Sequence, residues 1–184
     1  TWVFIPLIGL SAMVTYESAN GTLRRLLVTP TSKATFLGGT ILGQGLTALV
    51  QMSILIVFGI LVMKMKWGQS PAGLALVMLS FTLAAAALGT MLGTFVKSES
   101  QANGLSVLIG MLMAMMGGCW YPIELFPAGI RSAAQVLPTY WAMQGFLDIA
   151  VRGQGPAGVL QGCAVLLGFA LLFFSVGIAR FRYA

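Results

Sequence analysis

The sequence predicts an all-α protein, a polytopic bundle of membrane-spanning helices. Its 184 residues are 58% hydrophobic and only 8% charged, with a mean hydropathy of +0.94, whereas soluble domains carry roughly 25% charged residues. The few charges separate long uncharged runs, each longer than the roughly 20 residues that a helix needs to cross about 30 Å of hydrocarbon. Single long runs favour helices, because a membrane barrel would show short segments of alternating hydrophobicity.

The positions of the charges set the expected spans along a single transmembrane domain, 1–184. We expect four full spans, at residues 36–63, 71–96, 100–119 and 155–179. Residues 1–15 are apolar but about five residues short of a full span, so we expect them to be the end of one. The chain opens on Thr1 without an initiator Met, which predicts a fragment lacking its natural start.

Two connecting segments are expected to have structure of their own. Within 120–152, the stretch 132–147 is uncharged but short and is interrupted by Pro138, which favours an external re-entrant or interfacial helical element. The segment 16–35 is expected to be cytoplasmic, because Lys and Arg concentrate on the inner side of membrane proteins. The expected inner cations are Arg24, Arg25, Lys33, Lys97, Arg180 and Arg182, against Lys64, Lys66, Arg131 and Arg152 outside.

The segment 16–35 predicts a short amphipathic helix. Leu23, Leu26 and Leu27 share one face at helical spacing, and Arg24 and Arg25 project from another. Pro30 ends the helix, because the residue before a proline disfavours helical geometry. Two interpretations follow: a helix lying on anionic lipid headgroups, or a docking helix whose leucines enter a groove of a cytoplasmic partner.

Two motifs resemble the ABC type-2 transporter permease family. The first is the run Glu17 to Pro30, which contains Gly21-Thr22-Leu23 and Leu27-Val28-Thr29-Pro30 and looks like that family's coupling helix. The second comprises Gly117-Gly118-Cys119-Trp120-Tyr121-Pro122-Ile123-Glu124-Leu125-Phe126-Pro127 and Leu137-Pro138-Thr139-Tyr140-Trp141. It is similar to the family's pattern after its fifth helix, so the resemblance covers essentially the whole chain.

The resemblance implies a permease subunit of an ATP-driven exporter in the bacterial inner membrane. In that family six helices form each permease, and two permeases, identical or paralogous, pair within the lipid. Cytoplasmic ATP-binding subunits bind ATP and Mg²⁺ and grip the coupling helices, so this chain itself is expected to bind no cofactor. Residues 1–15 would then end helix two. The residues implied to couple to the ATP-binding subunit are Glu17, Gly21, Thr22, Leu23, Arg24, Arg25, Leu26, Thr29 and Pro30.

The chain departs from the family pattern in the coupling segment. The family often has acidic residues flanking Gly-Thr-Leu, where this chain has Ala19 and Arg24. We therefore expect the polar contacts with the ATP-binding subunit to differ, with Arg24 and Arg25 as the candidates for altered contacts.

The composition excludes several classes of function. The chain has no His and two Cys, Cys119 and Cys163, so it offers no zinc spacing and no nucleophile–base pair. Both thiols are expected to be buried and inert, an interpretation favoured over a disulfide or a redox site. No glycine-rich G-x-x-x-x-G-K-[ST] loop is present, so another chain must handle ATP. The net charge of +6 is spread over the ends of the loops and indicates no nucleic-acid binding. We therefore expect no catalytic residue and no metal site.

Polar residues within the spans are candidates for a translocation path. Gln44 and Gln51 lie seven residues apart on one helix face, and Ser106 lies in another span; hydrogen bonding to a neighbouring helix is the alternative for the glutamines. The spans contain no ionisable residue, which disfavours a proton- or sodium-coupled carrier. The candidate external gate comprises Pro122, Glu124, Pro127 and Pro138.

Small residues and methionines have more than one interpretation. GxxxG pairs at Gly39/Gly43, Gly89/Gly93 and Gly158/Gly162 predict close helix packing within the chain or, less favoured, a dimer seam. Met111, Met113, Met115 and Met116 spread around one helix, which favours flexible packing or a deformable substrate surface over copper binding. Two rival functions remain at this stage: a membrane scaffold that recruits a cytoplasmic protein, and a secondary carrier.

Overall fold

The structure is a computed structural model that describes residues 33–62, 64, 70–96 and 98–180. The expected partial span 1–15 and the coupling segment up to residue 32 lie outside these residues. The described residues form α-helices and one short 3₁₀ helix, with no strand among them, so the all-α class is confirmed for this part of the chain. The helices are α3 (Lys33–Leu61), α4 (Pro71–Gly93), α5 (Glu99–Met116), η1 (Ile123–Leu125), α6 (Ala128–Ala134), α7 (Pro138–Ala150) and α8 (Pro156–Arg180).

Local signals in the sequence place the starts of α4 and α5. The hydroxyl of Ser70 accepts a hydrogen bond from the Gly73 backbone N–H over 3.2 Å, and Pro71 occupies the first turn of α4. Ser98 accepts in the same way from the Gln101 N–H over 3.3 Å. Each cap satisfies a backbone donor that has no partner within its helix.

A pair of glycines ends α5. Gly117 is the C-cap residue, and Gly118 follows with φ of +82°, a conformation that side chains disfavour. The Cys119 N–H then donates to the Ala114 carbonyl over 3.0 Å. This is the Schellman arrangement, which satisfies carbonyls at a helix end and turns the chain away from the helix axis.

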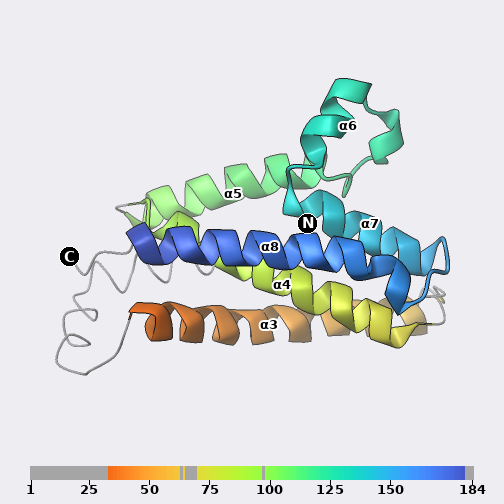
Figure 1. Cartoon of the computed structure of the whole chain (residues 1–184), viewed down its shortest axis with the longest axis horizontal. Helices are drawn as coiled ribbons and strands as arrows, with labels where there is room; N and C mark the ends of the chain where they lie inside the picture. The colour runs from red at the N-terminus through yellow and green to blue at the C-terminus, as the bar shows by residue number, and fades with distance from the viewer. Residues whose placement is uncertain (1–32, 63, 65–69, 97, 181–184) are drawn as a thin grey trace.

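Helix α4 is the centre of the bundle (Figure 1). It packs most extensively on α8 and also contacts α3, α7 and α5. Its run Ala84–Ala87 is buried, and small side chains let helix backbones approach closely in lipid. Phe81 and Ala84 pack there against Ala142 of α7 and Leu166 of α8.

Helices α3, α4, α5 and α8 begin and end within a few residues of the four predicted spans, while the number of membrane crossings stays a prediction. Helices α3, α4 and α8 are long and apolar enough to cross a membrane. Helix α5 has 18 residues, so it is about 27 Å long, and its apolar part, Ser100–Met116, is shorter still. The membrane crossing of α5 therefore stays a prediction.

The long helices alternate in direction, so their ends gather in two groups (Figure 1). One group holds the start of α3, the end of α4, the start of α5 and the end of α8. There the Arg180 guanidinium lies over the Phe95 ring, 5.1 Å from its centroid. The end of α3 and the start of α4, between which Lys64 lies in the sequence, are at the opposite end. This alternation matches the predicted loop sides, while the side of the membrane that each group faces stays a prediction.

The GxxxG pairs differ in their surroundings. Gly89 and Gly93 are buried in α4, and Gly162 lies in contact with α7, since a Cβ there would be 3.6 Å from the Trp141 carbonyl oxygen. Gly39 and Gly43 are exposed and face open space. Packing among the described residues therefore accounts for the pair on α4 and not for the pair on α3.

The sulfur-containing residues also separate into buried and exposed sets. Met113 packs with Leu88 and Leu92 in the core, whereas Met111 and Met115 are exposed. Cys163 is buried, as expected, but the predicted burial of Cys119 is wrong, because this residue is exposed. The reason is the Schellman turn, which carries Cys119 out of the helical packing.

Candidate functional site

Three prolines organise the 120–152 element into short helices. Pro122, Pro127 and Pro138 stand at the starts of η1, α6 and α7 respectively. The first turn of a helix tolerates proline because its N–H would lack a helical partner there, and the fixed φ suits the helix. The predicted helical pair is thus α6 and α7, while the re-entry of this element into the membrane stays a prediction.

A tryptophan fixes the connection between α6 and α7. The Trp141 indole N–H donates to the backbone carbonyl of Gln135, the residue that caps α6, over 2.8 Å. Tyr140 meets the Trp141 ring edge-on, with 5.6 Å between the ring centroids. These contacts hold the end of α6 against the first turn of α7.

Helix α5 is joined to α7 at a point of close backbone approach. The buried Thr139 hydroxyl donates to the Met113 carbonyl over 2.8 Å. Gly117 lies at the same point, where a Cβ would be only 2.6 Å from the Thr139 Cβ and 2.7 Å from the Met113 oxygen. Glycine is therefore the residue that fits here. The 120–152 element is thus tied to the end of α5 by a hydrogen bond and by direct packing.

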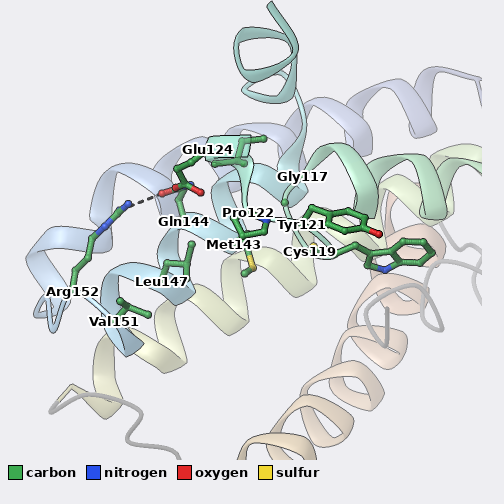
Figure 2. Close-up of a pocket in the computed structure, with 13 residues that line it drawn as sticks. Gly117, Cys119, Tyr121, Pro122, Glu124, Met143, Gln144, Leu147, Val151 and Arg152 are labelled. Atoms are coloured by element: carbon green, nitrogen blue, oxygen red, sulfur yellow. Dashed lines mark hydrogen bonds between the residues drawn. The ribbon is translucent and has the colours of Figure 1, made fainter. Parts of the chain in front are cut away.

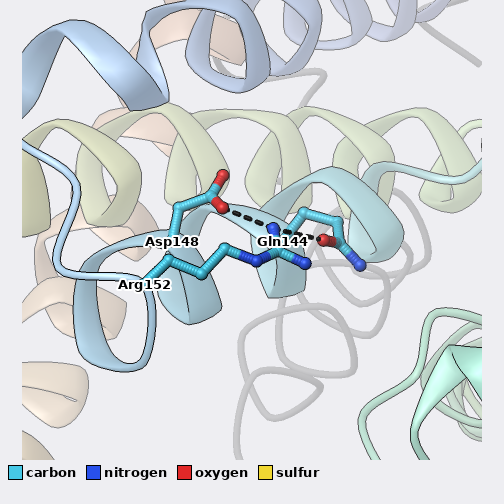
Figure 3. A network of polar contacts seen from close by, with 3 residues as sticks. All are labelled: Gln144, Asp148 and Arg152. Atoms are coloured by element: carbon cyan, nitrogen blue, oxygen red, sulfur yellow. Dashed lines mark hydrogen bonds and ion pairs between the residues drawn. The ribbon is translucent and has the colours of Figure 1, made fainter.

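The outward face of α7 carries a small polar network (Figure 3). Arg152 forms an ion pair with Asp148 and also donates to the Gln144 side-chain oxygen over 3.2 Å. The hydrogen bond from Arg152 to Asp148 raises the pKa of Arg152 above its ordinary value, with the charge of Asp148 adding to the effect. The guanidinium is therefore a permanent, positioned cation at this end of the bundle.

Two open hollows flank this network. The first, which we call the apolar hollow, measures about 350 Å³, and Cys119, Trp120, Tyr121, Met143, Leu147 and Val151 form its apolar side (Figure 2). The second, the polar hollow, measures about 410 Å³ and includes Arg131, Ser132, Gln135 and Tyr140. Both are also lined by Ile123, Glu124, Gln144 and Arg152, which form the wall between them.

Of the four predicted gate residues, only Pro122 and Glu124 line a hollow. Glu124 is exposed and lines both hollows, and Pro122 lines the apolar one. Pro138 is buried beside the joint between α5 and α7, and Pro127 starts α6. The prolines thus shape the backbone, whereas Glu124 is the gate candidate that presents a functional group to the hollows.

The candidate path residues lie on different helices. Ser106 of α5 is fully buried, while Gln44 and Gln51 of α3 are half-buried. Helices α3 and α5 both pack on α4 and lie on opposite sides of it (Figure 1). None of the three residues lines the two hollows above, and the path stays a prediction. The coupling residues from Glu17 to Pro30 lie outside the described residues.

Sequence reasoning missed the roles of Gly117 and Thr139. Both belong to the second resembling motif, but neither was singled out within it. The signal for Gly117 was available, because two successive glycines directly after an apolar helix are typical of a C-terminal cap. No local signal points to Thr139, because its partner Met113 lies 26 residues away.

Three apolar helices of spanning length, of which α4 is buried at the centre of the bundle, define a polytopic integral membrane protein. Comparison with known proteins identifies its family. A profile described as ABC-2 family transporter protein matches residues 1–179. The chain therefore belongs to the ABC-2 transporter family, and it is a transport permease component, as the resemblance implied.

Curated relatives agree with this assignment. The chain is 28% identical over 181 residues to the linearmycin resistance permease protein LnrN of Bacillus subtilis (strain 168), covering 98% of this chain and 47% of the relative. It is 28% identical to the putative transport permease YvfS of the same organism, covering 85% and 63%. The inner membrane transport permease YhhJ of Escherichia coli (strain K12) is 29% identical, covering 99% and 48%. The chain thus spans about half the length of two of these relatives and under two thirds of the third.

Proposed function

We propose that this chain is the membrane-spanning part of an ATP-driven exporter, worked by separate ATP-binding subunits and paired with a second permease. The observation that carries the proposal is the family match over residues 1–179. Membership implies association with ATP-binding subunits in an ABC transporter. A location in the bacterial inner membrane is proposed by analogy with YhhJ, whose name places it there.

The coupling segment is the proposed point of force transfer. ATP binding closes the partner subunits, which push on the helix from Glu17 to Pro30, and the connection to α3 passes the movement to the bundle. ATP binding then favours one of two packings of the permease pair, and hydrolysis restores the other. The leucine face of this helix is proposed to occupy a groove of the ATP-binding subunit.

The response at the other end of the bundle is proposed to run through α5. Among the described helices α5 contacts chiefly α4 and α7, and its last turn is tied to α7 by Thr139. A shift of α5 would therefore move α7 and the wall that contains Glu124 and Arg152. The 120–152 element is in this way suited to open and close the outer end of a path.

Co-purification with measurement of ATPase turnover tests the proposal. The chain, purified from membranes in mild detergent, should bring down an ATP-binding subunit. Leu23→Asp or Leu26→Asp should lower the amount recovered, or its turnover, by about tenfold, because a charge in an apolar docking groove costs at least about 1.4 kcal/mol. Ser32→Asp is the matched control, because it adds the same charge two residues beyond Pro30.

The rival functions give other results. A scaffold would bring down a cytoplasmic partner without nucleotide-dependent transport. A secondary carrier would show transport that is insensitive to vanadate and follows a proton gradient. Full turnover in the Leu23→Asp and Leu26→Asp variants would contradict the proposed role of the coupling helix.

A further inference from the structure

We propose that the apolar and polar hollows of the 120–152 element together bind one zwitterionic phospholipid with a primary ammonium group, the headgroup chemistry of phosphatidylethanolamine. The polar hollow takes the headgroup, and the apolar hollow takes the first part of the acyl chains. The site is a property of the described residues alone and requires neither ATP nor a partner subunit.

The arrangement of the two hollows indicates that the ligand is an amphiphile. They share the wall formed by Ile123, Glu124, Gln144 and Arg152 and differ in what lies beyond it. One side presents an arginine, a serine hydroxyl and an amide, and the other presents aromatic and aliphatic side chains. Each volume falls in the range of about 300–1,000 Å³ that is typical of small-molecule sites. An amphiphile lying across the wall matches both sides at once.

The charges select the headgroup. Arg152 is already held by Asp148 and Gln144, whereas Arg131 and Glu124 form no ion pair among the described residues. Beside the Arg152–Asp148 pair, whose arginine also feels the charge of Glu124, the polar hollow therefore offers the cation of Arg131 and the carboxylate of Glu124. A phosphodiester suits the guanidinium of Arg131, because arginine pairs with phosphate oxygens through two parallel hydrogen bonds. An adjacent ammonium suits the carboxylate of Glu124.

The same charges disfavour two other common headgroups. An anionic headgroup without an ammonium, such as that of phosphatidylglycerol, leaves Glu124 without its partner and next to a like charge. The quaternary ammonium of phosphatidylcholine has no N–H to donate to the carboxylate. Both therefore lack one of the interactions that a primary ammonium phospholipid makes.

The apolar hollow fits the interfacial depth of a lipid. Trp120 and Tyr121 are exposed there, and these amphipathic rings favour the level of the headgroups. Met143 and Leu147 line the α7 side, and methionine adapts its shape to irregular apolar ligands. The open side of the hollow lets the acyl chains continue into the bilayer.

Native mass spectrometry tests the site. The delipidated chain in mild detergent is titrated, without nucleotide, with phosphatidylethanolamine, phosphatidylcholine and phosphatidylglycerol of identical acyl chains. We expect phosphatidylethanolamine to be retained about fivefold better than either of the others, the effect of one charge at a membrane surface. Glycerophosphoethanolamine, the free headgroup, is a further arm. It should bind far more weakly, because it cannot occupy the apolar hollow, and equal binding would overturn the lipid assignment.

Two substitutions shift the retention in different directions. Arg131→Gln should lower the retention of phosphatidylethanolamine and phosphatidylglycerol alike. Glu124→Gln should lower the retention of phosphatidylethanolamine and raise the retention of phosphatidylglycerol. Misfolding cannot produce these opposite changes. Lys64→Gln is the matched control, because it removes an exposed cation at the same end of the bundle but outside both hollows, and it should bind like the wild type.

Equal retention of the three lipids, or wild-type preference in both the Arg131 and Glu124 variants, would overturn the site. Because the measurement uses no nucleotide, that outcome leaves ATP-driven transport untouched. Conversely, a failure to find an ATP-binding partner leaves the lipid site untouched.

Discussion

The hydroxyl of Thr139 donates a hydrogen bond to the backbone carbonyl of Met113 over 2.8 Å, which ties the first turn of α7 to the last turn of α5. The same carbonyl accepts from the Gly117 N–H, also over 2.8 Å. One carbonyl thus joins the cap of α5 to the 120–152 element. This joint is the place where a movement of α5 would reach the hollows.

Removing the Thr139 hydroxyl should weaken the joint without creating a cavity. Thr139→Val keeps the shape of the side chain, and we expect a loss of about 0.6–1 kcal/mol in the free energy of unfolding, the usual size of such a bond in a membrane protein. The melting temperature in detergent should fall by about 1–4 °C. Thr47→Val is the control, because it removes an exposed hydroxyl that bonds within its own helix, and it should melt like the wild type; equal melting of Thr139→Val and the wild type would show that the Thr139 bond contributes nothing.

Adding a methyl group at Gly117 should be more harmful than removing the hydroxyl. The new Cβ of Gly117→Ala would overlap Thr139 and the Met113 carbonyl, and overpacking of this kind costs about 1–3 kcal/mol. Gly129→Ala on α6 is the matched control, since a Cβ there meets nothing within 4 Å. Melting of both variants in detergent measures the difference, and equal stability would contradict the close approach of α5 and α7.

A second tight contact links α7 to the central helix. A Cβ at Gly145 would lie 3.0 Å from one γ-carbon of Val77 and 3.2 Å from the other. We expect Gly145→Ala to destabilise the fold by about 1–3 kcal/mol and the added change Val77→Ala to recover part of this loss, because it removes both γ-carbons.

A double-mutant cycle on detergent melting separates this coupling from the cost of each single change. Gly104→Ala supplies the control in open space, and there alanine should be neutral or slightly stabilising, since it is the better helix former. Strictly additive effects of Gly145→Ala and Val77→Ala would exclude the contact.

Cys119 provides a reporter of sidedness. It is exposed beyond the end of α5, whereas Cys163 is buried, so a membrane-impermeant maleimide should label Cys119 alone. Nearby protein atoms partly shield the Cys119 thiol from water, and this desolvation raises its pKa, while the residue keeps an exposed surface. Because the thiolate is the reacting form, the labelling rate should keep rising with pH above about 8.5, where an ordinary thiol has half ionised.

The proposed orientation fixes the side from which labelling occurs. In intact cells the reagent should reach Cys119, and it should also reach a cysteine introduced by Lys64→Cys in a Cys119→Ser background. In the same Cys119→Ser background, the cysteine introduced by Ser98→Cys lies at the opposite end of the bundle and should react only in inside-out vesicles. Labelling of Ser98→Cys from outside intact cells would invert the orientation and remove the basis for export.

The ends of the helices were largely predictable because they depend on local chemistry. Pro71 and Gly117 mark the start of α4 and the end of α5, and the predicted spans begin and end within a few residues of the observed helices. The division of the 120–152 element at Pro138 was predictable for the same reason. Glu124 was already a candidate for the external gate, but its position between two hollows required α7 to be placed.

The sequence by itself determined that this is an α-helical membrane protein, where its long helices lie along the chain, and that it resembles ABC-2 permeases. Only the tertiary structure decided which helix is central. Helices α3, α4 and α8 are all apolar enough to span a membrane, yet 67% of the apolar window of α4 is buried, against 17% for each of the other two. In a water-soluble protein the buried face of a helix is apolar and the exposed face is polar, so the sequence itself shows which face is buried. In a bilayer lipid tails are as apolar as neighbouring helices, so the central position depends on shape, on alanines such as Ala84 and glycines such as Gly145 that let backbones meet.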